Sequence, residues 1–337
     1  MARPLVVGVD LGGTKVATAS AGADAAIVSR VTRQTEPDRG VDAVVATIID
    51  SVKEAVTEAG ASLEDVAGVG VGSPGPLNPE TGMVIFAPNL RWHDVPLVAM
   101  MEQALNVPVY IENDANLAAL GEARYGAGRG SKNMVYITVS TGIGGGLILG
   151  GEIYSGSSFI AGEIGHMTIT DEDGSPRCGC GNYGCLEALA SGPAIARMAR
   201  ELIRHGEETM ILELVHGNVE LVTSEVVGKA AMAGDAAAIA ILGKAADYLG
   251  IGIANLVNIL NPDTVVIGGG VSRVGGILLK PVREVVAERA LKPAFEAVRI
   301  VGAELGADAG VVGAVCLALS RLRATEAAAK RGTGTGR

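Results

Sequence analysis

The stretch MVYITVSTGIGGGLILGG, residues 134–151, repeats an order of elements that the chain first shows in LVVGVDLGGTKVATAS, residues 5–20. Each stretch contains an apolar run typical of a buried strand, then a glycine turn, then a second apolar run. Further strands and helices follow each copy. This repeated order predicts a duplicated α/β fold, with two domains and a cleft between the copies.

The pattern of apolar residues and turn signals supplies the remaining elements. We expect strands at residues 26–32, 66–72, 107–111, 164–169, 264–268 and 297–302, and helices at 41–59, 115–124, 186–204, 235–260 and 309–323. The domains that follow are a small first domain at 1–112, joined by the last helix at about 309–323, and a larger second domain at 113–308. Residues 325–337 are expected to form a disordered tail.

Composition excludes several classes of protein. The chain has 337 residues and a formal net charge of −10, so it lacks the basic face that a nucleic-acid binder needs. No charge-free apolar run reaches the length of about 18 residues that a membrane span requires. The N-terminal residues do not have the layout of a signal peptide. We therefore expect a cytoplasmic protein that binds neither nucleic acid nor membrane.

The first glycine turn, DLGGTK, is a candidate phosphate site. Gly12 and Gly13 let backbone N–H groups face an anion, and Thr14 and Lys15 add a hydroxyl and a positive charge. Asp10 could hold a metal-bound water. An ordinary hairpin is the alternative interpretation, and the matching turn in the second copy makes that alternative weaker.

Two other glycine-rich segments need separate interpretation. VIGGGVS, residues 266–272, suits a nucleotide base or ribose lying on bare backbone, although a tight corner between strand and helix has the same composition. The G-x-G-x-x-G match at 70–75 is not followed by a helix, and the match at 179–184 lies inside the cysteine cluster. Neither has the context that a dinucleotide-binding fingerprint requires. ENDAN, residues 112–116, places a carboxylate at a strand end, which suits either a general base or a helix cap.

The motifs DLGGTK, GSPGP, IENDAN, STGIGGG, AGEIGHM and CGCGNYGCLE occur in this order along the chain. In this combination the sequence resembles the ROK family of sugar kinases, most closely its bacterial glucokinases. The resemblance implies the actin-like, ribonuclease H-type fold, which agrees with the duplicated halves. The family also contains repressors with a DNA-binding domain before the first phosphate motif. Only four residues precede the first strand here, so we expect the kinase branch.

The resemblance implies ATP-dependent phosphorylation of glucose to glucose 6-phosphate, with Asp114 as the catalytic base. It also implies that Asp10 helps to place Mg²⁺. The nucleotide-binding positions are Asp10, Gly12, Gly13, Thr14, Lys15, Thr141, Gly142, Gly268, Gly269 and Gly270. The sugar-binding positions are Gly75, Asn89, Asn113, Asp114, Glu163, His166 and Glu187.

Three of the four cysteines of the chain crowd into residues 178–185. A disulfide knot is disfavoured in a reducing compartment, and C-x-C is an awkward spacing for a redox pair. Three thiolates and one imidazole make the closed tetrahedral set that structural Zn²⁺ prefers. The resemblance implies the same set, Cys178, Cys180, Cys185 and His166, with free thiols as the remaining alternative.

Other functions stay open at this point. Kinases that act on fructose, mannose or an N-acetylhexosamine share the motifs, and a sugar-sensing protein could bind a ligand without turnover. The intact Asp114 and both glycine turns disfavour a sensor, because binding alone requires neither. Family resemblance implies a homodimer or homotetramer.

Overall fold

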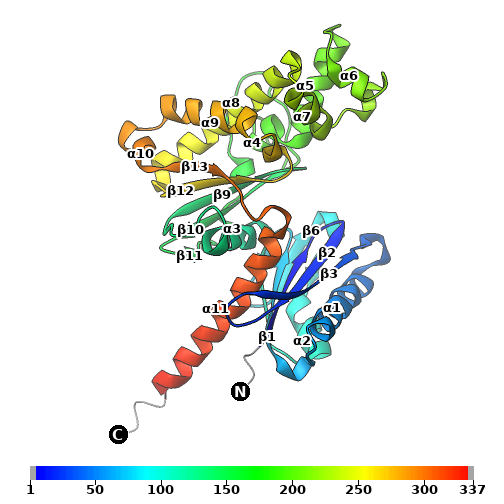
Figure 1. The fold of residues 1–337 in the computed structure, drawn as a ribbon, viewed down its shortest axis with the longest axis vertical. Coiled ribbons are helices and arrows are strands. Elements are labelled where there is room, and N and C mark those ends of the chain that lie inside the picture. Colours follow the sequence, from blue (N-terminus) through cyan, green and yellow to red (C-terminus); the bar gives the residue numbers. More distant parts are fainter. Residues whose placement is uncertain (1–4, 333–337) are drawn as a thin grey trace. The chain divides into compact units, whose positions relative to one another are not determined.

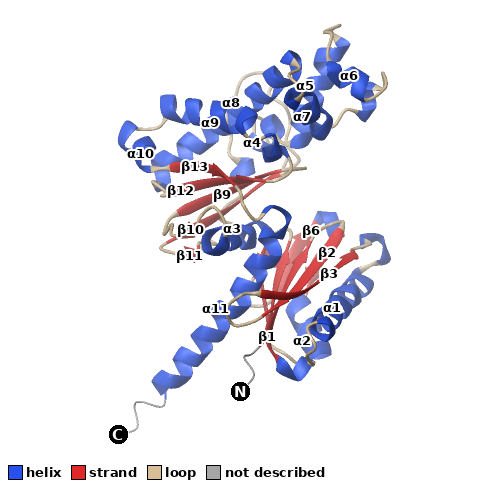
Figure 2. Cartoon of the chain, viewed as in Figure 1, coloured by secondary structure: helices blue, strands red, loops and turns tan. Residues whose placement is uncertain are grey.

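The computed structural model describes residues 5–332, with side chains through residue 325, and these residues divide into two compact units. The first unit holds the chain up to Gly126, the segment Ile153–Ala161, and the chain from Ala307 onward. The second unit holds Ala127–Glu152 and Gly162–Gly306. Each unit is built on a five-stranded sheet with helices packed against it, so the predicted duplicated α/β fold is confirmed (Figures 1 and 2).

The sheet of the first unit has the order β3-β2-β1-β4-β8, with β1, β4 and β8 parallel and β2 and β3 antiparallel. Its strands are β1 (Leu5–Leu11), β2 (Lys15–Ala21), β3 (Ile27–Gln34), β4 (Val66–Ser73) and β8 (Val109–Asn113). Its helices are α1 (Val41–Glu58), α2 (Leu97–Leu105), α3 (Asp114–Tyr125) and α11 (Ala309–Gly332), with short 3-10 turns η1 (Pro37–Arg39), η2 (Leu63–Asp65), η3 (Pro88–Leu90) and η7 (Gly306–Asp308).

Both faces of β1 are buried, because its alternating side chains meet different layers. Val7 and Val9 belong to the large cluster that α1 and α2 cover. Val6 points to the opposite face and packs with Val315 of α11. The sheet therefore lies between α1 on one face and α11 on the other, as the first unit in Figure 2 shows.

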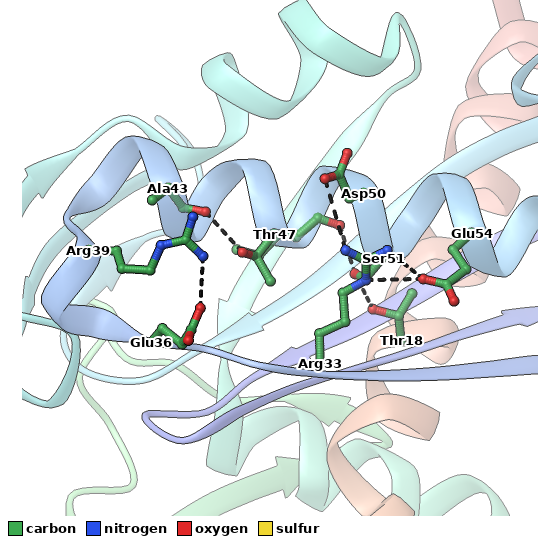
Figure 3. A network of polar contacts seen from close by, with 10 residues as sticks. Thr18, Arg33, Glu36, Arg39, Ala43, Thr47, Asp50, Ser51 and Glu54 are labelled. Carbon is green, nitrogen blue, oxygen red and sulfur yellow. Dashed lines mark hydrogen bonds and ion pairs between the residues drawn. The ribbon is translucent and has the colours of Figure 1, made fainter.

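Polar contacts anchor α1 on the antiparallel strands (Figure 3). The hydroxyls of Thr18 and Ser51 are 2.7 Å apart in the buried layer between β2 and α1. Arg33 of β3 donates to Glu54 of α1 at 2.6 Å. Buried hydroxyls that bond to one another cost little, and this pairing lets a helix with polar positions pack on the sheet.

Helix α11 approaches the sheet closely because glycines face it. A Cβ added at Gly70 would overlap the Ala314 carbonyl, and one added at Gly8 would lie 2.6 Å from the Val311 carbonyl oxygen. We expected this helix to end near residue 323 and a disordered tail to follow it, but α11 continues to Gly332. Residues 333–337 lie outside the described residues.

The boundary between the units also differs from the one expected after residue 112. Helix α3 packs against α11 within the first unit, where Gly313 of α11 lies directly on the Leu117 carbonyl. The first unit therefore extends to Gly126. Periodicity within α3 could not show this, because the partner helix lies almost two hundred residues further along the chain.

The first unit also carries a small antiparallel sheet, β5-β6-β7, that the sequence analysis did not anticipate. Its strands are β5 (Leu77–Asn78), β6 (Met83–Ala87) and β7 (Trp92–Val95). Trp92 is 1% exposed and belongs to the core of this unit.

The sheet of the second unit has the order β11-β10-β9-β12-β13. Its strands are β9 (Met134–Val139), β10 (Ile143–Leu149), β11 (Glu152–Ile153), β12 (Thr264–Gly268) and β13 (Arg299–Gly302). Its helices are α4 (Leu186–Ala190), α5 (Gly192–Arg204), α6 (Met210–Leu214), α7 (Ser224–Met232), α8 (Ala236–Leu260), α9 (Gly276–Arg289) and α10 (Lys292–Ala297), with 3-10 turns η4 (Ile164–His166), η5 (Val219–Leu221) and η6 (Val271–Val274).

Two expectations for the second unit need correction. The segment 164–169 is not a strand: it begins with the turn η4 and pairs only through the single bridge Thr168↔Cys185. The helix expected at 186–204 is two helices, because Ser191 is extended and its side chain accepts from Ala194 N as the cap of α5. Helix α8 is long and apolar enough to cross a membrane, although half of its most apolar window is buried and it packs against α9 and α4.

Candidate active site and metal centre

Parallel pairing gathers predicted site residues of the first unit at one edge of its sheet. Asp10 of β1 pairs with Gly72 of β4, and Gly72 pairs with Glu112 of β8. The carboxyl ends of parallel strands meet at the same edge, which is where ligands bind in open α/β sheets. The first glycine turn, the GSPGP loop and the ENDAN motif therefore lie side by side.

The first glycine turn differs in one detail from its expected use. The N–H of Gly12 donates to the Lys15 carbonyl oxygen at 2.9 Å and closes the hairpin, so this N–H is occupied within the turn. Thr14 and Lys15 are exposed at its tip. A Cβ at Gly13 would lie 3.1 Å from Cβ of Asn89, so the turn contacts a predicted sugar residue.

Asp10 is a half-buried carboxyl whose charge is incompletely compensated. Burial raises the pKa of Asp10 from 3.8 to about 6, and the positive charge of Lys15 partly opposes the rise. A Cβ added at Gly310, near the start of α11, would lie 2.6 Å from the Asp10 carboxylate, so the glycine makes room for this side chain. A cation at this edge would favour the ionised carboxylate, so the residue suits the proposed Mg²⁺ position.

The ENDAN motif contains a helix cap and, next to it, the carboxylate predicted to be the base. Asn113 caps α3, because its Oδ1 accepts from Ala115 N at 2.9 Å and Asn116 N at 3.3 Å. Asp114 is the first residue of α3, and its Oδ1 accepts from Ala115 N at 2.8 Å. Since Asn113 caps the helix, the Asp114 carboxylate is held at the N-terminus of α3.

Glu112 has a positioning role that its sequence pattern does not reveal. It is 5% exposed, and its Oε1 accepts from Asn113 N at 2.9 Å and from Asn116 Nδ2 at 3.0 Å. Ser155 donates to its Oε2 at 3.4 Å. A buried carboxylate with these partners fixes the backbone just before Asp114. The only clue in the sequence is that Glu112 lies two residues before Asp114 at the end of a predicted strand.

In the second unit, the glycine segments again meet at the carboxyl edge of parallel strands. Thr138 of β9 pairs with Gly268 of β12, so the turn after β9 and the segment Gly268–Gly270 are neighbours. Gly269 has a φ of +85°, and a Cβ there would overlap the Val139 backbone. Only glycine fits this position, which makes the segment both a tight corner and a stretch of bare backbone.

The turn after β9 is fixed by contacts inside the second unit. Ser140 N donates to the Gly142 carbonyl oxygen at 2.8 Å, which closes the turn. Ile143 N donates to Oε2 of Glu187 at 3.0 Å. Thr141 is exposed at the tip, and Gly142 is partly exposed beside it.

The cysteine cluster has the dimensions of a metal site. One donor atom each from His166, Cys178, Cys180 and Cys185 lies within 4.8 Å of every other. Sγ of Cys180 is 3.7 Å from Sγ of Cys185, and Sγ of Cys178 is 3.6 Å from Nδ1 of His166. Tetrahedral Zn²⁺, with bonds of about 2.3 Å to sulfur and about 2.0 Å to nitrogen, requires about 3.8 Å between sulfurs and about 3.5 Å from sulfur to nitrogen. The four residues therefore fit the ion.

Backbone hydrogen bonds shape this cluster. Cys178 N donates to the Asn182 carbonyl oxygen at 2.7 Å, and Ile169 N donates to that of Gly184 at 2.8 Å. Gly184 has a φ of +67°, and a Cβ there would overlap the Thr170 carbonyl. No disulfide joins the cysteines, all four of which are free thiols.

The three thiols of the cluster differ in the direction of their pKa shifts. Burial raises the pKa of Cys178, and it raises the pKa of Cys185 to about 12. The backbone N–H of Asn182 instead lowers the pKa of the exposed Cys180 thiol. The cluster thus combines two protected thiols with one that faces water.

One of the predicted sugar-binding residues, His166, is part of the cluster, and two others, Glu163 and Glu187, contact it. His166 directs Nδ1 toward Cys178, and its Nε2 is 3.8 Å from Oε2 of Glu163. Oε1 of Glu187 is 3.7 Å from Sγ of Cys178. The two ring nitrogens of His166 therefore face different partners, as required of a residue that binds a metal and a ligand at once.

The predicted site residues thus form one group in each unit. The first unit contains Asp10, Gly12, Gly13, Thr14, Lys15, Gly75, Asn89, Asn113 and Asp114. The second contains Thr141, Gly142, Glu163, His166, Cys178, Cys180, Cys185, Glu187, Gly268, Gly269 and Gly270.

Comparison with known proteins gives consistent results. The sequence model of the ROK family matches residues 6–321. A glucokinase from Halalkalibacterium halodurans is 41% identical over 91% of this chain and 92% of its own length. A xylose repressor from Caldicellulosiruptor bescii is 36% identical over 81% of this chain and 67% of its own length.

Among solved structures, the chain is similar to a ROK family glucokinase from Streptomyces griseus, crystallised with glucose and AMPPNP. The TM-score is 0.80 with 35% sequence identity, and the match covers 93% of this chain and 98% of that one.

Proposed function

The chain belongs to the ROK family, and we propose that it acts as a glucokinase, which transfers the γ-phosphoryl group of ATP to the 6-hydroxyl of glucose. The observation that carries this proposal is the position of Asp114 at the sheet edge of the first unit. There it lies beside the GSPGP loop and close to the first glycine turn. A sensor that only binds sugar would need neither a general base nor a phosphate-binding turn.

Each group of residues has one task in the proposed reaction. Asp114 orients the 6-hydroxyl and accepts its proton as the phosphoryl group arrives. Thr14 and Lys15 of the first unit, and Thr141 and Gly142 of the second, bind the phosphates, with Gly268–Gly270 under the adenosine. Mg²⁺ bound with ATP would neutralise phosphate charge, and Asp10 would hold it.

The sugar-binding groups suit a ligand that presents only hydroxyls. We propose Gly75, Asn89 and Asn113 from the first unit, and Glu163, His166 and Glu187 from the second. Amides donate and accept, and carboxylates accept, so a missing hydroxyl leaves one of these groups unpaired. This cost gives selectivity for a complete hexose.

We also propose one structural Zn²⁺ at His166, Cys178, Cys180 and Cys185, supported by their fit to tetrahedral distances. The ion would fix the His166 ring while Nε2 stays directed toward Glu163. A cytoplasmic homodimer or homotetramer completes the proposal, on the ground of family membership.

ADP release measured with a panel of hexoses tests the proposed function. We expect the highest kcat/KM with glucose, and lower values with fructose, mannose and N-acetylhexosamines. Asp114→Asn should lower kcat by about 10²- to 10⁴-fold and leave the Kd for glucose within about tenfold. Calorimetric binding of a sugar without any ADP release would instead favour a sensor, the role that the likeness to a repressor suggests.

A further inference from the structure

We infer that Glu187 is a positioning residue for the nucleotide as well as a sugar ligand: its carboxylate joins the turn at residues 140–143 to the cysteine cluster. Metal loading would then set ATP affinity along with sugar affinity. The inference rests on the proposed function, because it takes Thr141 and Gly142 as phosphate-binding residues.

The first contact that carries the inference is with the turn itself. Oε2 of Glu187 accepts from Ile143 N at 3.0 Å. The same oxygen would lie 2.5 Å from a Cβ at Gly142, so the glycine leaves room for the carboxylate. Ile143 is 3% exposed, and its N–H would lose its acceptor if the carboxylate were removed. A buried donor without a partner is costly, so the turn would rearrange.

The second contact is through the backbone of the same segment. Ser191 N donates to the Glu187 carbonyl oxygen at 3.1 Å, and Gly192 N donates to the Ser140 carbonyl oxygen at 2.8 Å. A Cβ at Gly192 would be 2.9 Å from that Ser140 oxygen, so this approach is close as well. Residues 187–192 therefore hold both ends of the turn, Ser140 at one end and Ile143 at the other.

The third contact leads to the cysteine cluster. Cys185 directly precedes α4, and Leu186 N donates to the Met167 carbonyl oxygen at 2.9 Å, which fixes the start of that helix beside His166. Oε1 of Glu187 is 3.7 Å from Sγ of Cys178. An ion held by Cys178, Cys185 and His166 would therefore fix the segment from which Glu187 reaches the turn.

This arrangement is unusual for a phosphate site, because it brings a negative charge next to the turn. The charge of a carboxylate at this position repels the phosphates of a bound nucleotide. The hydrogen bond from Ile143 N to Glu187 gives the side chain a structural role beside the turn, and a neutral acceptor at the same position can keep that bond. Glu187→Gln and Glu187→Ala therefore separate position from charge.

The test is a calorimetric titration of the full-length protein with AMPPNP and Mg²⁺ in the absence of sugar. Glu187→Ala should weaken AMPPNP binding about tenfold or more, because the Ile143 N–H loses its acceptor. Glu187→Gln should stay within about threefold of wild type, because its amide oxygen still accepts. Glu213→Ala is the control: it removes an exposed carboxylate of α6 in the same unit, outside the proposed site, and should leave AMPPNP binding unchanged.

A second arm tests the metal link. Cys180→Ser, with zinc content measured by elemental analysis, should lose zinc and weaken AMPPNP binding together. Equal AMPPNP affinity in wild type, Glu187→Ala and zinc-free Cys180→Ser would overturn the inference while glucose phosphorylation by wild type stood. Wild-type protein that bound no AMPPNP would overturn the proposed function and the inference together.

Discussion

At the scale of single residues, the Asp114 carboxylate and the four donor residues of the cysteine cluster carry the proposed chemistry. Asp114 and Asn113 could be singled out because ENDAN follows a strand, and the cysteines because they crowd within eight positions. That the N–H of Gly12 is used inside its own turn could not be foreseen, because the partner of a backbone group depends on turn geometry. Glu112 was missed for a similar reason, since its partners include Ser155 from a distant segment.

Asp10 gives a prediction at this scale that depends on pH. Its pKa is raised from 3.8 to about 6 in the folded protein, so folding favours the protonated carboxyl. The stability that this proton contributes is complete below about pH 4 and is lost as the pH rises through about 6. Asp10→Asn removes the cost of the buried charge, and without Mg²⁺ its stability should exceed that of wild type by up to about 3 kcal/mol at pH 8 and by about 1 kcal/mol at pH 4.5.

Denaturant unfolding of both proteins between pH 4.5 and 8, in metal-free buffer, measures this difference. A stability difference that grows with pH agrees with the raised pKa. Parallel stability curves for wild type and Asp10→Asn would contradict it.

At the scale of elements, long periodic helices and buried strands were predictable, while short or interrupted elements were not. The break at Ser191 divides an apolar pattern that looks continuous in sequence, because the break is made by the Ser191 cap. Segment 164–169 has strand-like composition, but the turn η4 directs His166 to the cysteines instead. Helix α11 extends beyond the end expected near residue 323, because the small and charged residues that follow suit a helix and a disordered tail equally.

Helix packing gives a prediction at this scale, with two helical glycines as a matched pair. Gly313 of α11 lies against the Leu117 carbonyl of α3, and an added Cβ would overlap it. Gly243 of α8 has no atom within 4 Å of an added Cβ. Gly313→Ala should destabilise the protein by about 1 to 3 kcal/mol through overpacking, whereas Gly243→Ala should stabilise it by about 0.5 to 1 kcal/mol through helix propensity.

Thermal unfolding followed by circular dichroism measures both variants against wild type. Opposite shifts of the midpoint support the close approach of α11 and α3. A Gly313→Ala variant as stable as Gly243→Ala would show that the two helices do not meet at this glycine.

At the scale of the whole molecule, the sequence revealed the duplication but not the division of the chain. The repeated order of strand, glycine turn and strand predicted two sheets, and each unit contains one. The first unit also takes up Ile153–Ala161 and the C-terminal helix, which only long-range packing decides. The small sheet β5-β6-β7 escaped notice because its strands are short and lie between turns.

The separate cores of the two units lead to a prediction about the metal. Trp92, the one tryptophan of the chain, lies in the core of the first unit, and the cysteine cluster lies in the second. A structural zinc contributes directly to folding, so Cys180→Ser should lower the unfolding midpoint of the second unit by roughly 5 to 10 °C. Tryptophan fluorescence should shift less than circular dichroism, which reports both units.

Elemental analysis of the wild type should find one zinc per chain. Active protein without zinc would contradict the metal assignment. Equal shifts by both probes would contradict independent cores.

The central claim is that the chain phosphorylates glucose at its 6-hydroxyl with ATP, and ³¹P NMR of the reaction tests it most directly. The account predicts that the γ-phosphate signal of ATP disappears as the phosphomonoester signal of glucose 6-phosphate grows at the same rate, with ADP as the only other product. Asp114→Asn should leave the ATP signals unchanged over the same period. Release of inorganic phosphate without a sugar ester, or ATP left intact in the presence of saturating glucose and Mg²⁺, would contradict the account.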